Sequence, residues 1–99
     1  MINDVNLDFK IDVPFENLFA SKGRTKIIKI LAIKNEASIT SIVKDSKLNH
    51  SNVKSHLKYL LNIGLIQEKR FGRIKIYRYR NELIKAKILK ETILFWNNE

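Results

Sequence analysis

The sequence contains no cysteine, only one proline and three glycines, and no long apolar run. Without cysteine the chain cannot form disulfide bonds, thiolate nucleophiles or thiolate zinc sites, which suits a reducing compartment. The longest stretch free of charged side chains covers nine residues, 59–67, whereas a helix that spans a bilayer needs about 20. A secretory signal is not expected, because three aspartates interrupt the first 12 residues and no basic segment precedes them. These absences predict a cytoplasmic protein that makes no membrane contact.

Acidic residues are scarce as well, and the charge imbalance is local. The chain carries 19 Lys and Arg against 10 Asp and Glu, a net charge of +9. Residues 21–80 hold 15 basic and 3 acidic side chains, while the segment before them is acidic and the segment after them is neutral. A basic middle predicts a surface that binds a polyanion. A solvated basic face without a partner is the alternative.

The length predicts one domain with a short addition at each end. At 99 residues, 44% of them apolar, the chain can bury one core but not two. Apolar and polar residues alternate over 5–13, which predicts a short strand ended by Pro14 and followed by a helical turn at 15–20. The chain therefore divides into an N-terminal extension, a central domain and a C-terminal helix, at residues 1–20, 21–80 and 81–99.

Two helices are predicted in the first half of the central domain. Ser21 is suited to cap a helix over 22–34. A strand of one or two residues is expected at Ile39, and Thr40 would cap a second helix over 41–47. The inward face of the first helix would carry Ile27, Ile30 and Leu31.

A third helix and a hairpin complete the central domain. The helix would cover 50–62, with Asn49 as its N-cap and Gly64 as a left-handed C-cap. The pattern then changes to strands at 65–70 and 74–79 around a glycine-containing tip. A short helix, a tight turn, a second helix and a hairpin is the order of a winged helix-turn-helix. The predicted fold is therefore mainly α with a small β-hairpin (α+β).

The C-terminal helix, predicted from Asn81 to about residue 97, has more apolar side chains than one face can bury. Such a surplus on a terminal helix predicts a homodimer joined through this helix. The alternative is that this helix packs on the core of its own chain. The apolar residues are Leu83, Ile84, Ile88, Leu89, Ile93, Leu94, Phe95 and Trp96.

The polar face of the helix at 50–62 is the strongest candidate for a binding surface. On a helical wheel Val53, Leu57 and Leu60 share an apolar arc, and no residue of this helix carries a carboxylate. Duplex DNA disfavours acids, while Ser, Asn and Lys bond base edges and phosphates. A sequence-specific contact to double-stranded DNA in the major groove is predicted. The contact residues would be His50, Ser51, Asn52, Lys54, Ser55, Lys58 and Tyr59.

The hairpin concentrates four cations within seven residues, a composition suited to the phosphate backbone or the minor groove. Phe71 at its tip either packs back on the domain or touches the sugar–phosphate edge. Lys22 and Arg24, at a helix start, are lesser candidates for phosphate contact. The four wing cations are Lys69, Arg70, Arg73 and Lys75.

Two stretches carry a family resemblance. Residues 21–31 (SKGRTKIIKIL) resemble the entry to the first core helix of archaeal winged-helix regulators. Residues 48–60 (LNHSNVKSHLKYL), followed by 63–66 (IGLI), resemble the recognition-helix segment of ArsR-like regulators. The resemblance implies a transcription regulator that binds DNA, usually as a homodimer. The matching positions near the major groove would be His50, Ser51, Asn52, Lys54 and Ser55.

The sequence departs from this family at two places. Metal-sensing members carry a cysteine pair on the helix before the turn, and residues 41–47 have none. The turn position usually held by glycine is Lys47, at a cost of about 1 kcal/mol if its backbone is left-handed.

Nothing in the sequence predicts an enzyme, a cofactor or a metal site. His50 and His56 lie six residues apart and point to different sides of one helix, and His56 is expected to pack rather than to ligate. An aromatic group of Phe15, Phe19, Phe95 and Trp96 is expected in the core rather than around an effector. Two alternatives to the regulator remain: a winged helix for protein–protein assembly in transcription machinery, and a protein that coats DNA without sequence preference.

Overall fold

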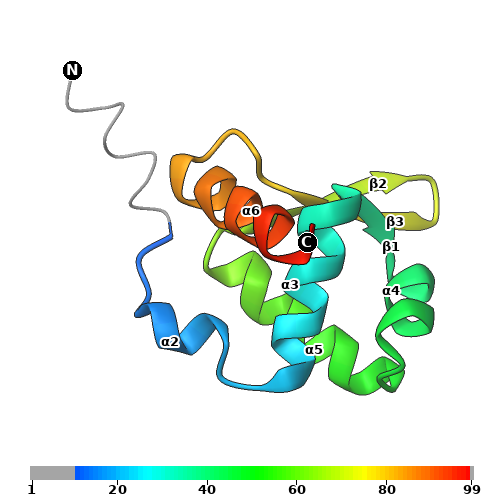
Figure 1. Cartoon of the computed structure of the whole chain (residues 1–99). Helices are drawn as coiled ribbons and strands as arrows, with labels where there is room; N and C mark the ends of the chain where they lie inside the picture. Colours follow the sequence, from blue (N-terminus) through cyan, green and yellow to red (C-terminus); the bar gives the residue numbers. More distant parts are fainter. Residues whose placement is uncertain (1–10, 99) are drawn as a thin grey trace.

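The structure is a computed structural model that describes residues 11–98 (Figure 1). Of the expected strand at 5–13, residues 5–10 lie outside this range, and residues 11–13 do not form a strand. The expected turn at 15–20 is confirmed as the short helix α2. The elements in chain order are α2 (Phe15–Leu18), α3 (Lys22–Lys34), β1 (Glu36–Ser38), α4 (Ile39–Ser46), α5 (His50–Asn62), β2 (Ile66–Phe71), β3 (Ile74–Tyr79) and α6 (Ile84–Asn97).

Helix α3 has the predicted bounds because its cap is local. The Ser21 side chain accepts a hydrogen bond from the Arg24 backbone N–H at 3.1 Å, and this satisfies one of the free N–H donors of the first turn. Its inward face is wider than predicted. Ile28 and Ala32 are buried together with the expected Ile27 and Leu31, whereas Ile30 is only partly buried.

The short strand lies just before the predicted place. Residues 36–38 form β1, which pairs antiparallel with β3 in a sheet of order β1-β3-β2. Ile39 already belongs to α4, and Ser38 rather than Thr40 is the cap, accepting a hydrogen bond from the Ser41 backbone N–H at 3.2 Å. The prediction was wrong by two residues because pairing with β3, forty positions along the chain, fixes the strand.

The turn between α4 and α5 places Lys47 in the conformation that costs about 1 kcal/mol for a residue other than glycine. Lys47 adopts the left-handed conformation, with φ 62° and ψ 24°. Asn49 then caps α5 by accepting a hydrogen bond from the Asn52 backbone N–H at 2.8 Å, and Gly64 ends the helix at φ 85°. The order of a winged helix-turn-helix is thus complete, with α4 and α5 as its two helices and β2–β3 as its wing.

Lys47→Gly is expected to stabilise the protein. A side chain in the left-handed region costs about 1 kcal/mol, and glycine removes that cost. The melting temperature should rise by roughly 4–8 °C, measured by circular dichroism. Lys47→Ala is the matched control, because it removes the ammonium but keeps the strained Cβ. An equal gain from alanine would show that charge, not backbone strain, is relieved.

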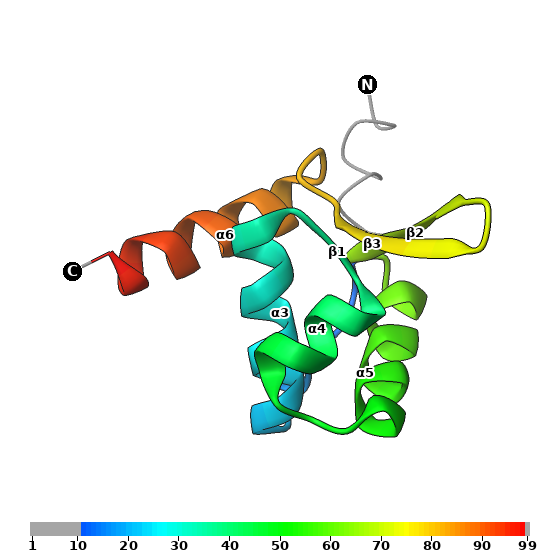
Figure 2. The same ribbon diagram turned by 90° about the vertical axis from the view of Figure 1, so that its right-hand side faces the viewer.

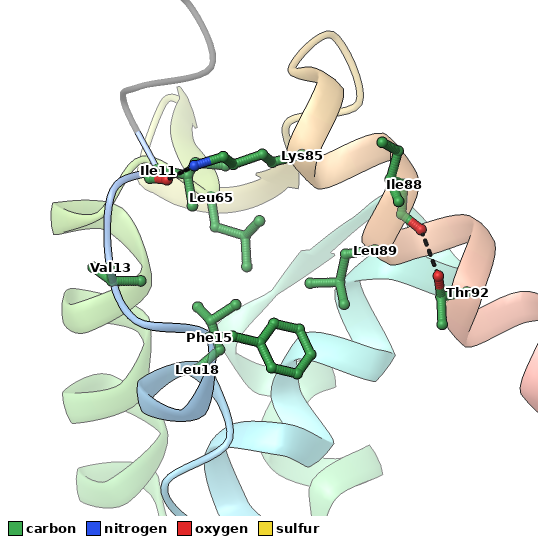
Figure 3. A pocket seen from close by; sticks show the side chains of 9 residues that line it. All are labelled: Ile11, Val13, Phe15, Leu18, Leu65, Lys85, Ile88, Leu89 and Thr92. Atoms are coloured by element: carbon green, nitrogen blue, oxygen red, sulfur yellow. Dashed lines mark hydrogen bonds between the residues drawn. The ribbon is translucent and has the colours of Figure 1, made fainter.

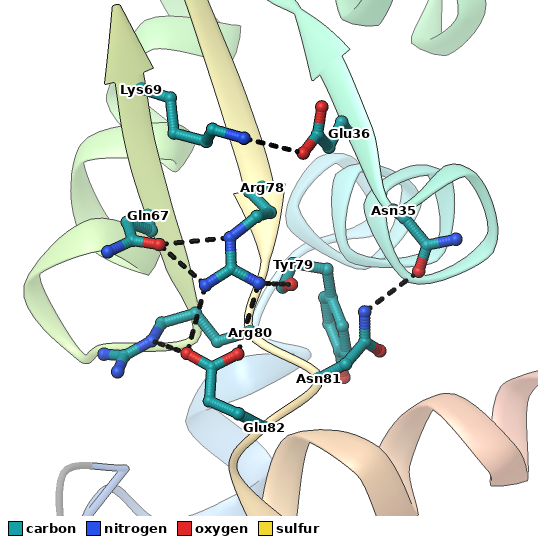
Figure 4. Close-up of polar contacts among 9 residues, drawn as sticks. All are labelled: Asn35, Glu36, Gln67, Lys69, Arg78, Tyr79, Arg80, Asn81 and Glu82. Carbon is teal, nitrogen blue, oxygen red and sulfur yellow. Dashed lines mark hydrogen bonds and ion pairs between the residues drawn. The ribbon is translucent and has the colours of Figure 1, made fainter.

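The link from β3 to α6 differs from the prediction. Helix α6 begins at Ile84 rather than Asn81. The Asn81 side chain donates a hydrogen bond to Asn35 Oδ1 at 3.0 Å, and the neighbouring Glu82 binds Arg78 (Figure 4). Residues 81–83 therefore form a turn and a bend instead of a helix. Long-range side-chain contacts therefore override the helical pattern at this end.

Helix α6 packs on the core as far as Ile93. Ala86 is fully buried, and its carbonyl accepts a hydrogen bond of 2.6 Å from the hydroxyl of Tyr79. Burial raises the pKa of Tyr79. Leu94, Phe95 and Trp96, in the last turns, are 40%, 82% and 76% exposed. Figure 2 shows this end of α6 extending away from the rest of the molecule. Within residues 11–98, no helix is long and apolar enough to cross a membrane.

Candidate nucleic-acid interface

Helix α5 has one buried side and one open side. Val53, Leu57 and Leu60 are 0–2% exposed and anchor the helix on the core, as the wheel predicted. Six of the seven predicted contact residues lie on the open side. The exposed residues are His50, Ser51, Asn52, Lys54, Ser55 and Lys58.

Tyr59 does not belong to this open face. Its hydroxyl is buried and has no hydrogen-bond partner among residues 11–98. The guanidinium of Arg24 lies over the Tyr59 ring, 3.7 Å from the ring centre, and also donates a hydrogen bond to the backbone carbonyl of Asn17. Arg24 therefore joins α3 to α5 by a cation–π contact. The structure places both residues at an internal contact rather than on the predicted binding surface.

His56 lies beside the same contact. An added Cβ at Gly23 would stand 3.1 Å from His56 Nε2, so the imidazole packs closely on the first turn of α3. Burial, followed by the positive charge of Arg24, lowers the pKa of His56. The ring thus has a packing role, as the sequence suggested, and the lowered pKa favours its neutral form. Among residues 11–98, no group of three His, Asp or Glu side chains is arranged to hold a metal ion.

The open face of α5 borders the hairpin. A groove runs between them, with Lys54, Ser55 and Lys58 on one wall and Glu68 and Tyr77 on the other. In Figure 2 the hairpin projects past α5 on the side of the molecule opposite to α6. Helix α5 and the hairpin therefore face the same space.

The sheet places three of the four wing cations on two opposite faces, and the fourth, Arg73, lies in the turn. Side chains alternate along a strand, so Arg70 and Lys75, which are cross-strand partners, share the face of Glu68 and Tyr77. Lys69 lies on the opposite face, where its ammonium binds Glu36 of β1 at 3.1 Å. Only Arg70 and Lys75 of these three thus continue the groove.

Arg73 stands at the wing tip, and Phe71 ends the strand before it. Gly72, at φ 62°, and Arg73 form the two-residue turn, so Phe71 belongs to β2 rather than to the tip as predicted. Phe71 is 59% exposed and lies 5.6 Å below the Lys69 ammonium. Phe71 does not pack back on the core, so the first of the two alternatives that the sequence left open for this side chain is wrong.

Glu68 is the groove residue that sequence reasoning missed as part of the site. Among the described residues, Glu68 is the only acidic side chain that lines this wall of the groove. Arg70 offsets its charge, because the Glu68 carboxylate lies 3.5 Å from Arg70 Nε. The signal was present in the sequence, because Glu68 and Arg70 are two apart on one strand and so share a face.

The base of the wing is tied to the start of α6 by a polar cluster (Figure 4). Arg78 of β3 donates to Gln67 Oε1 at 2.7 and 3.1 Å and to both carboxylate oxygens of Glu82 at 3.1–3.2 Å. These hydrogen bonds lower the pKa of Glu82 to about 2. The wing is thus fixed at its base, while Arg73 and Lys75 near its tip make no ion pair among the described residues.

Lys22 lies apart from this groove. It borders a different surface depression, together with Lys26 and Lys29 on the solvent side of α3. The structure therefore does not bring Lys22 together with the α5 and wing residues in the groove.

The family described as "Bacterial regulatory protein, arsR family" matches residues 21–68, which run from the α3 cap into β2. Residues 21–68 form an arsR-family helix-turn-helix domain. The match supports a role in DNA-binding regulation of transcription. No curated protein sequence matches the chain.

Solved structures share the fold of this arsR-family domain and its flanking elements. HlyU from Vibrio cholerae N16961 superposes with a TM-score of 0.73 at 17% identity, covering 99% of this chain and 96% of HlyU. The transcriptional repressor PagR of Bacillus anthracis gives 0.68 at 20% identity, covering 94% and 99%. The homodimeric winged helix-turn-helix DNA-binding domain Mb0332 from Mycobacterium bovis gives 0.66 at 20% identity, covering 99% and 82%.

Proposed function

We propose that this chain binds double-stranded DNA sequence-specifically, as a homodimer, with α5 in the major groove and the wing on the phosphate backbone. The observation that carries the proposal is the groove between α5 and the hairpin. It joins a helix face without carboxylates to the cationic face of the wing. Duplex DNA presents an acceptor-rich groove between two anionic backbones, which matches both walls.

The residues of the interface have different roles in this proposal. Ser51, Asn52 and Ser55 are short and polar, suited to base edges, while Lys54 and Lys58 reach bases or phosphates. His50, in the first turn of α5, lies where backbone N–H groups favour a phosphate. The wing contacts are Arg70, Arg73 and Lys75. Lys22 is a peripheral contact. Lys69 is left out because it lies on the sheet face away from the groove, and Arg24 and Tyr59 are left out because they form an internal contact.

The dimer is proposed to form through the last turns of α6. Leu94, Phe95 and Trp96 expose a continuous apolar end of the helix, and the similar Mb0332 domain is described as homodimeric. Two recognition helices would then lie about 34 Å apart and bind half-sites about 10 base pairs apart. Sedimentation at micromolar concentration measures the state, and a monomer would contradict this part.

Residues 1–20, 21–80 and 81–99 are proposed as extension, DNA-binding domain and dimerisation helix. A cytoplasmic location agrees with the absence of cysteine. The proposed relation to archaeal regulators depends only on the resemblance of residues 21–31 to the first core helix of those proteins.

Two substitutions test whether α5 contacts the bases and the wing contacts the phosphates. Ser55→Ala should reduce the preference for a selected site over random duplex, because it removes a base-edge contact. Arg73→Ala should weaken all duplexes alike and lower the slope of log K against log salt by roughly one unit, because it removes one phosphate contact. Fluorescence anisotropy over a salt series measures both quantities.

Three outcomes would contradict the proposal. If both substitutions act equally on selected and random DNA, helix and wing do not have separate roles. If no duplex is bound at low salt, the fold serves protein–protein assembly. If selection from a random oligonucleotide pool enriches no palindrome, the protein coats DNA without sequence preference.

A further inference from the structure

An apolar pocket lies outside the helix-turn-helix, between the segment leading into α2 and the first half of α6 (Figure 3). Its volume is about 360 Å³, within the usual range for small-molecule sites. Ile11 and Phe15 form one side, Leu89 of α6 the other, and Leu65 the floor. Of the four aromatic residues considered from the sequence, only Phe15 lines this pocket.

The pocket has few polar groups, and they differ in whether they have hydrogen-bond donors left for a ligand. The Thr92 hydroxyl donates to the Ile88 carbonyl at 2.9 Å, so this side chain is satisfied within α6. Lys85 is the single charged lining residue. Its side chain stretches across the rim, where the ammonium donates to the Ile11 carbonyl at 2.9 Å (Figure 3). An ammonium has three donors, so two remain for an anion at the mouth.

We propose that this pocket binds a small apolar monocarboxylate, with the hydrocarbon part against Phe15, Leu65 and Leu89 and the carboxylate at Lys85. At about 30 Å³ for each water-sized group, the volume holds roughly a dozen such groups. One cation at the edge of an otherwise apolar site complements a ligand with a single anionic end. A polyanion or a sugar would leave its polar groups without partners among the lining residues.

The pocket adjoins the surface proposed for the dimer, because Thr92 and Trp96 are four residues apart on α6, but it is formed by other residues. The exposed end of α6 comprises Leu94, Phe95 and Trp96, whereas the pocket uses Lys85 to Thr92 in the preceding turns. Three chain segments surround the pocket, and this concave shape favours a small molecule over a second protein surface.

Leu65 connects the pocket to the DNA-binding elements. Its backbone N–H donates to the Leu60 carbonyl at the end of α5, and its carbonyl accepts from Arg80 at 3.1 Å. A ligand on the Leu65 side chain therefore contacts the junction of α5, wing and α6. We expect ligand and DNA to change each other's affinity by the same factor. This coupling rests on the proposed function, whereas ligand binding itself does not.

Calorimetry with the whole chain tests the site, using decanoate as the probe and decanol as its uncharged counterpart, both below their aggregation concentrations. Decanoate should bind at one site per chain, and decanol at least tenfold more weakly. Lys85→Gln should lower decanoate affinity at least tenfold, Lys85→Arg should restore most of it, and the exposed Lys87→Gln on the same helix should leave it unchanged. Leu89→Trp should fill the pocket and lower the affinity for both probes, with folding checked by circular dichroism.

Equal binding of decanoate and decanol would overturn the assignment of an acid, as would full affinity in Lys85→Gln. Absence of saturable decanoate binding, or unchanged binding in a folded Leu89→Trp, would overturn the site. If decanoate binds but leaves the affinity for DNA unaltered, the coupling is wrong. Failure of the ligand-free protein to bind any duplex would instead contradict the proposed function.

Discussion

Ser55→Glu is expected to lower the affinity for duplex DNA by more than a hundredfold. Ser55 stands on the wall of the groove between α5 and the wing, with Lys54 and Lys58 beside it. A carboxylate there would lie within a few ångströms of phosphates and base acceptors. At the effective dielectric constant near a protein surface, two like charges about 4 Å apart repel by about 4 kcal/mol. A loss of about 3 kcal/mol corresponds to a hundredfold, measured by anisotropy at fixed salt.

Ser55→Gln is the matched control. Glutamine has the size and reach of glutamate without its charge, and Ser55 is exposed, so neither change should move the melting temperature by much. We expect Ser55→Gln to bind DNA within roughly tenfold of the parent, at the cost of one or two base contacts. If glutamine and glutamate reduce binding equally, bulk rather than charge is responsible. If neither does, the open face of α5 does not meet DNA.

Sequence alone predicted what local chemistry controls. The bounds of α3 and α5 follow from caps three residues away, Ser21 to Arg24 and Asn49 to Asn52, and both were confirmed. The apolar arc of α5 also follows from helical spacing, because Val53, Leu57 and Leu60 meet one core. The left-handed backbone of Lys47 was raised only as a condition, because the resembling family usually has glycine at this position, and the structure shows that the condition holds.

The features that the sequence could not predict depend on contacts between residues that are far apart along the chain. Lys69 is one of four cations that look equivalent in sequence, yet Glu36 of β1, 33 positions earlier, pairs with it on the face away from the groove. Tyr59 flanks the apolar arc of α5, and only the Arg24 guanidinium on its ring shows that it faces α3. The late start of α6 has the same origin, because Asn35 binds Asn81 across 46 positions. Pairing in space decides which of several similar side chains remain available for a ligand.

Leu57→Ala is expected to produce the largest loss of stability among the α5 variants. Leu57 is 2% exposed, between Val53 and Leu60 on the buried side of the helix. Removing a buried leucine side chain and leaving a cavity costs about 3 kcal/mol. For a domain of this size the melting temperature should fall by roughly 10–25 °C, followed by circular dichroism.

Lys58→Ala is the neighbouring control, since it alters the open side of the same helix turn. It should change stability by less than about 0.5 kcal/mol while weakening DNA binding. Leu57→Ala should do the opposite below its own melting temperature, where the intact polar face still meets DNA with nearly parental affinity. If Leu57→Ala melts with the parent, or Lys58→Ala loses stability without losing affinity, the two sides of α5 have been assigned in reverse. The recognition surface would then have to be sought elsewhere, because its construction depends on this helix presenting one face to the core and the other to the duplex.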